Sequence, residues 1–246
     1  MKTIYLLSIR ETISESWLKL SGAKGTFWAA YLVSILIFIG IAILAGLGKF
    51  ISPLLSILIG GIAQFVNVLL QLGILYIGIQ RAFDKPINYK QLFRTLQKDI
   101  TLKIIGLFIL KFLIYFCVFL IIFIPTIFFT TLDTLAGINM TGTNIGKLIT
   151  AATYLISILL VIYFYTRLFL ASAFVLDREL NPWLAIKSSF TATRSNIWRI
   201  IGIIIISILL LVIGAIPLGI GLIWTFPLVF IILGVTYKKL LVNMNG

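Results

Sequence analysis

Long apolar stretches without any charged residue constrain this chain more than any other feature. Residues 27–46 carry no charge, and neither do residues 200–235. A helix crosses the hydrocarbon core of a bilayer with about 20 apolar residues. Hydrophobic residues make up 61% of the 246, whereas charged residues make up only 11%, against about 25% in an average soluble domain. Too few polar side chains remain to cover a water-soluble globule, so the sequence excludes a soluble enzyme, a disordered tail and a disulfide-rich secreted module.

Six apolar segments have the composition of membrane-spanning helices. The first four are residues 27–46, 53–80, 104–129 and 148–170. The last stretch, 200–235, is too long for one helix, and the Pro and Gly residues at 214–221 predict a turn that divides it into two short helices. The alternative is five spans plus one re-entrant segment. The sequence therefore predicts an all-α membrane protein with six transmembrane helices, formed as one integral membrane domain over residues 1–246.

The basic residues fall almost entirely on one side of this topology. The N-terminal segment, the connections after the second and fourth spans, and the C-terminal tail hold four, six, four and two of the 20 Lys and Arg residues, sixteen in all. The opposite side holds only Lys49 and Lys147. Cytoplasmic loops are enriched in Lys and Arg, so we predict a multi-pass protein of the bacterial inner (plasma) membrane with both termini in the cytoplasm.

The net charge of +13 lies mostly on one side of this topology and indicates which molecules the protein binds. Basic residues beside an anionic membrane surface gain about 1 kcal/mol each. We therefore expect the partners to be membrane lipids with anionic headgroups at the cytoplasmic face, and we expect no nucleic acid.

Several residue types that catalysis needs are scarce. The chain has no histidine, its one cysteine is Cys117, and it has only seven Asp and Glu residues, none in the middle of a span. It contains no phosphate-binding loop, no nucleophile elbow and no zinc-protease motif. We therefore predict that the protein is not an enzyme and uses no metal or cofactor. The lack of an embedded carboxylate also disfavours a proton-coupled transporter or ion pump.

Three segments on the predicted cytoplasmic side have the pattern of amphipathic helices. In the first, apolar residues recur at steps of three and four, at Leu6, Ile9, Ile13, Trp17 and Leu20. The second covers residues 87–100, and the third covers 182–198, where Pro182 suits a helix start after Asn181 as a cap. We predict that all three lie in the headgroup plane, anchored by Trp17, Phe93, Trp183, Phe190 and Trp198.

Each amphipathic segment is followed by two spans. The chain can therefore be divided into three repeated units, near residues 1–80, 81–176 and 177–246. The alternative is that any amphipathic helix would give this similarity.

The run from Arg167 to Trp198 carries a more specific pattern, in which an arginine-containing apolar stretch and a short acidic turn precede an amphipathic helix. The matching residues are Arg167, Asp177, Ala185, Ser189, Phe190, Trp198 and Arg199. The run resembles the YciC-like superfamily of uncharacterised bacterial polytopic inner-membrane proteins, which includes the membrane domain found beside some glycerophosphodiester phosphodiesterases. This sequence departs from the family at residues 192–196, where relatives often carry a Thr-Arg-Gly-like turn. The resemblance implies a six-helix membrane protein without an established biochemical activity. The phosphodiesterase chemistry of some relatives belongs to a separate soluble domain, for which this chain has no room.

A few polar side chains fall inside the predicted spans. Gln64, Asn67 and Gln71 share one helix face, which we expect to turn toward protein, either as interhelical hydrogen-bond donors and acceptors or as the wall of a polar path. Lys111 and Arg167 lie in the cytoplasmic leaflet. They either extend to the interface or face a cavity that holds a lipid phosphate or another anion, where Tyr163 could add a hydroxyl.

Two functions fit these features. The first is a non-enzymatic role in organising or handling membrane lipid. The alternative is a small-solute or lipid transporter with a polar path near Gln64, Asn67, Gln71, Lys111 and Arg167.

Overall fold

The computed structural model describes residues 6–136 and 143–245, and within these ranges it is helical, with no strand. The elements are α1 (Ile9–Lys19), α2 (Lys24–Gly48), α3 (Pro53–Ala82), the 3-10 helix η1 (Tyr89–Leu96), α4 (Lys98–Ala136), α5 (Asn144–Leu168), α6 (Ala171–Arg178), α7 (Pro182–Thr193), α8 (Ile197–Ala215) and α9 (Leu222–Asn245). Six helical stretches in the described part are long and apolar enough to cross a membrane: Lys24–Gly48, Pro53–Ala82, Lys98–Ile121, Gly146–Arg178, Ile197–Ala215 and Leu222–Leu241. The predicted all-helical class and the six apolar helices are confirmed.

The helix boundaries follow local signals. Pro53 occupies the first turn of α3, where its missing N–H costs nothing, and the Ser52 hydroxyl accepts a hydrogen bond from the Leu54 N–H at 3.2 Å. The predicted turn between α8 and α9 is also present. Leu218 and Gly219 both have positive φ there, at 52° and 80°, so the chain leaves helical geometry at this turn.

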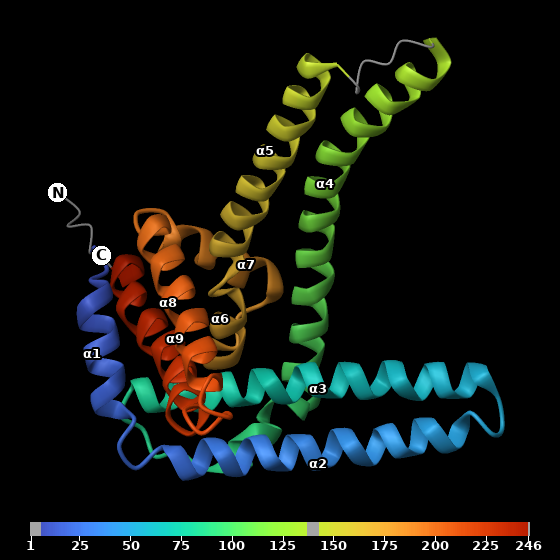
Figure 1. Ribbon diagram of the computed structural model, residues 1–246. Helices are drawn as coiled ribbons and strands as arrows, with labels where there is room; N and C mark the ends of the chain where they lie inside the picture. Colours follow the sequence, from blue (N-terminus) through green and yellow to red (C-terminus); the bar gives the residue numbers. More distant parts are fainter. Residues whose placement is uncertain (1–5, 137–142, 246) are drawn as a thin grey trace.

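Two long hairpins, α2–α3 and α4–α5, extend away from the rest of the molecule in different directions (Figure 1). Their apolar side chains are exposed, as at the turn after α2, where Phe50 is 90% exposed. Apolar surface of this extent indicates a lipid environment, since soluble proteins rarely expose large contiguous apolar patches.

The core lies where the second half of α3 meets η1, α6 and α9. Phe27 from α2, Ile74 from α3, Leu92 from η1, Phe174 from α6 and Tyr237 from α9 are all fully buried there. The Phe174 and Tyr237 rings pack edge to face with centroids 5.1 Å apart. This region holds together the ends of helices whose outer parts have few protein neighbours.

Helix α1 runs antiparallel along α9. At one end Lys239 lies 3.9 Å from Glu11, and just past the other end the Lys24 ammonium lies 5.2 Å from the centre of the Trp224 ring. The Trp28 indole N–H also donates to the Ile223 carbonyl at 3.2 Å. The turn between α8 and α9 therefore lies beside the start of α2. Six spans with both termini on one side would put this turn and the start of α2 on opposite sides; the structure places the two together, because α1 carries the chain back along α9 before α2 begins.

The three predicted interfacial segments differ in helix type and in neighbours. The first forms α1, whose fully buried residues are Thr12 and Ser16 rather than members of the apolar stripe. The second is the 3-10 helix η1, which packs against α3. The third forms α7, where Asn181 stands at the N-cap position but its side chain makes no capping hydrogen bond. Because these environments differ, the location of the segments at the membrane interface and the three-unit repeat stay predictions.

Candidate functional site

Arg167, at the end of α5, binds the end of α7. Its Nη1 donates to the Phe190 carbonyl at 2.7 Å and to the Thr193 hydroxyl at 3.1 Å. In return, the Ser189 hydroxyl donates to the Arg167 carbonyl at 2.6 Å. The last four carbonyls of a helix lack intrahelical donors, and the Arg167 guanidinium donates a hydrogen bond to one of them, that of Phe190.

Aromatic rings enclose the same guanidinium. Its central carbon lies 4.7 Å from the centre of the Phe190 ring and 5.8 Å from that of Tyr163. Arg167 is only 9% exposed, and within the described chain its Nε has no hydrogen-bond partner. The side chain therefore points into the protein rather than to the interface, whereas the anion contact predicted for Arg167 stays a prediction. Tyr163 contributes a ring face rather than a hydroxyl.

Lys111 makes a separate contact. Its Nζ donates to the Ser172 hydroxyl on α6 at 3.0 Å, so the ammonium joins α4 to α6. No contact connects Lys111 to Arg167 within the described residues. The two embedded cations are thus used as two distinct interhelical bonds.

The polar residues of α3 do not meet these cations. Gln64 is exposed, and Asn67 and Gln71 are half-buried. The expectation that their shared face turns toward protein is wrong at Gln64, because the first half of α3 has few neighbours besides α2 while the second half packs against η1 and α9. The predicted hydrogen-bonded face is therefore not formed at that end.

The predicted aromatic anchors differ in exposure. Trp17, Trp183 and Trp198 are 57%, 66% and 81% exposed, and Phe93 is 39% exposed. Phe190 is half-buried because it lies against Arg167. The four exposed rings are available to a membrane interface, which suits large amphipathic aromatics.

Two acidic residues, one in α6 and one just after it, make long-range contacts that the sequence did not predict. The Tyr237 hydroxyl donates to Asp177 at 3.0 Å, linking α9 to α6. Arg94 binds the Glu179 carboxylate at 2.8 Å, and Lys103 donates to the Glu179 carbonyl at 2.7 Å. Glu179 has a left-handed backbone with φ of 50°. The acidic turn was visible in the sequence, but its partners lie more than 50 residues away.

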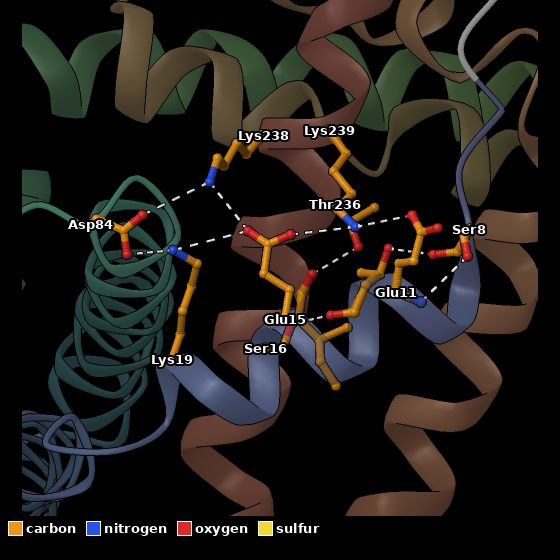
Figure 2. Close-up of polar contacts among 11 residues, drawn as sticks. Ser8, Glu11, Glu15, Ser16, Lys19, Asp84, Thr236, Lys238 and Lys239 are labelled. Atoms are coloured by element: carbon orange, nitrogen blue, oxygen red, sulfur yellow. Dashed lines mark hydrogen bonds and ion pairs between the residues drawn. The ribbon is translucent and has the colours of Figure 1, made fainter.

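A second missed group of charges joins α1, α9 and the loop after α3 (Figure 2). Glu15 lies 3.2 Å from Lys238 and 3.3 Å from Lys239, and 3.9 Å from Lys19. Lys19 also donates to Asp84. We call Glu15, Lys19, Asp84, Lys238 and Lys239 the α1–α9 charge cluster. It brings the first helix and the last helix of the chain together.

The hydrogen bond from Lys19 holds the pKa of Asp84 below its usual value of 3.8, although partial desolvation opposes this shift. A carboxyl with a lowered pKa stabilises the fold once the pH is above its unfolded pKa, and that contribution is lost as the pH falls through the folded pKa. Asp84 is therefore ionised at neutral pH.

Replacing Glu15 by glutamine is expected to lower the free energy of unfolding by about 1 kcal/mol, since it removes the carboxylate that both Lys238 and Lys239 approach. Glu11 is the matched control, because it lies on the same helix and, among the described residues, its one ion pair is at 3.9 Å. Glu11→Gln should change stability by less than about 0.5 kcal/mol. Thermal unfolding of both variants in detergent measures the difference, and equal effects would contradict the assigned role of Glu15.

Comparisons with known proteins return no match to a family model, a curated protein or a solved structure. The resemblance of residues 167–198 to the YciC-like superfamily therefore stays a prediction. In the structure Arg167, Ser189 and Phe190, which belong to that pattern, form a single contact group.

Proposed function

We propose that this protein is a non-enzymatic, multi-pass protein of the bacterial inner membrane that organises or handles lipid through its basic end. One observation supports this most strongly. Lys49 lies at the outer tip of the α2–α3 hairpin and Lys147 lies in the first turn of α5, whereas the six cations of residues 81–103 lie at the base of these hairpins (Figure 1). The base faces the cytoplasm in this proposal, as cytoplasmic loops carry the excess of Lys and Arg.

Several cations of the predicted cytoplasmic segments are available to headgroups. Lys90, Lys98 and Lys187 are exposed, and within the described residues none of the three has an ion pair. Exposed rings, including Phe93 and Trp183, are close to them in the sequence. Basic residues are attracted to anionic lipid headgroups, and aromatic residues are enriched at the same membrane interface.

Transport along the predicted polar path is not proposed. Gln64 is exposed, and Lys111 and Arg167 bind different protein partners. The contacts therefore support a lipid-binding end more than a polar path through the bundle.

The proposal predicts that anionic lipid co-purifies with the protein in excess over its share of the membrane. Replacing Lys90, Lys98 and Lys187 together by glutamine should lower the ratio of anionic to zwitterionic lipid at least about fivefold, since each cation near the surface contributes about 1 kcal/mol. Lipid analysis of protein extracted in mild detergent measures this ratio.

The control variant carries Lys49→Gln and Lys147→Gln at the hairpin tips and should retain the bound anionic lipid. A wild-type ratio equal to that of the bulk membrane, or an equal loss in the control, would contradict the proposal.

A further inference from the structure

Helix α1 presents two different faces, one packed against α9 and one largely exposed. On the first face Thr12 and Ser16 are fully buried, and α1 packs there against α9. Their hydroxyls donate to carbonyls one turn earlier in the same helix, at 2.7 Å to Ser8 and 2.6 Å to Thr12. No polar group of these two side chains is left unpaired, and small side chains allow α1 to lie close to α9.

The second face carries the apolar stripe that the sequence predicted. Ile9, Ile13 and Trp17 line a shallow, open hollow along the surface of α1 together with Arg10 and Ser14. Trp17 remains 57% exposed. The hollow is mostly apolar and carries a few polar groups.

Arg10 is the charge that distinguishes this face. The other three charged residues of α1 (Glu11, Glu15 and Lys19) approach partners on α9 or in the loop after α3. Arg10 is exposed and has no ion pair within the part of the chain that the structure describes. The hollow therefore combines an apolar wall with one unpaired cation, which is complementary to an amphiphile with an anionic head.

The hollow is continuous with the outer surface of α8. A Cβ atom on Gly202 would lie 2.9 Å from Ile9, so the two helices meet at that point. Trp198, Ile205 and Leu209 share the Gly202 face of α8 by helical spacing and are 81%, 51% and 50% exposed. Helix α8 is long and apolar enough to cross a membrane. The apolar stripe of α1 therefore extends the exposed apolar surface of α8.

We propose that this hollow binds an anionic phospholipid, with an acyl chain against Ile9, Ile13 and Trp17 and the phosphate on Arg10. A guanidinium can bind two phosphate oxygens at once, while its alkyl stem covers the apolar stripe. The inference rests on the proposed membrane function and adds a specific site to it.

Quenching of Trp17 fluorescence by brominated lipid tests the site. The signal of Trp17 is the difference between the wild-type protein and Trp17→Phe, which leaves the other four tryptophans in place. Both proteins are placed in lipid nanodiscs that contain the same minor fraction of brominated phosphatidylglycerol or brominated phosphatidylcholine. We expect brominated phosphatidylglycerol to quench the difference signal with about fivefold higher apparent affinity, the factor that one cation near a membrane surface provides.

The same difference is measured in the Arg10→Gln background, with and without Trp17→Phe. The ratio of the apparent affinities for the two brominated lipids should then be close to one. Arg194 is the matched control, since it is also exposed, and Arg194→Gln should keep the preference. Equal quenching by the two lipids in the wild type, an unchanged preference in Arg10→Gln, or no quenching by either lipid would overturn the proposal. Loss of lipid enrichment on replacing Lys90, Lys98 and Lys187 is a separate result, so failure at α1 and failure of the proposed function can be told apart.

Discussion

Replacing Gly78 by alanine is expected to lower the free energy of unfolding by about 1–3 kcal/mol, the usual cost of forcing extra volume into a packed core. A Cβ atom at Gly78 would lie 2.4 Å from the Phe230 carbonyl oxygen, and one at Gly234 would lie 2.4 Å from the Gly78 carbonyl oxygen. The obstacles are backbone atoms, so α3 and α9 would have to move apart. Far-UV circular dichroism during heating of the detergent-purified protein measures the loss.

Gly61 provides a control on the same helix. A Cβ atom there meets nothing within 4 Å, and alanine is favoured over glycine inside helices by about 0.5–1 kcal/mol. Gly61→Ala should therefore leave the midpoint unchanged or raise it slightly. If Gly61→Ala and Gly78→Ala destabilise equally, the close crossing of α3 and α9 is wrong.

The second large effect is expected at Arg167. Arg167→Ala should cost about 2–4 kcal/mol, because hydrogen bonds to charged groups are worth about 1.5–3 kcal/mol each and the end of α7 would lose its donor to the Phe190 carbonyl. The stability of Arg167→Lys should lie between those of the wild type and Arg167→Ala, since an ammonium keeps the charge but cannot reproduce the planar guanidinium that lies on the Phe190 ring. Thermal unfolding of the two variants beside Arg194→Ala, an exposed arginine, measures these costs.

The same variant separates a structural arginine from a lipid-binding one. Arg167→Ala should leave the amount of co-purified anionic lipid per folded protein unchanged, since the side chain is only 9% exposed and its Nη1 donates to α7. A loss of bound lipid at unchanged stability would show that Arg167 holds a headgroup instead.

Features that depend on local composition could be predicted from the sequence. The apolar helices follow from runs of about 20 apolar residues, and the turn after α8 follows from Pro217 and Gly219, the latter with φ of 80°. The start of α7 at Pro182 has the same kind of local origin. Each of these signals acts within a few residues of the structure it determines.

Features that depend on tertiary contact could not be predicted. Lys238, one partner of Glu15, lies 223 residues away in the sequence. Nothing in the sequence near Gly78 indicates that α9 crosses α3 there. The apolar stripe of α1 predicted an interfacial helix and gave no sign that the opposite face, with Thr12 and Ser16, would be buried against α9, where small side chains allow close helix packing. The turn between α8 and α9 has no charge, so counting basic residues could not place it beside α2.

Side-specific labelling of single cysteines tests the central claim, that the Lys- and Arg-rich base of the two hairpins faces the cytoplasm. Cys117 is exposed, so it is first replaced by serine, and Lys49→Cys at a hairpin tip is compared with Lys90→Cys at the base. A membrane-impermeant maleimide should label Lys49→Cys in intact spheroplasts and Lys90→Cys only after the membrane is opened. The reverse pattern, or labelling of both positions from one side, would contradict the account.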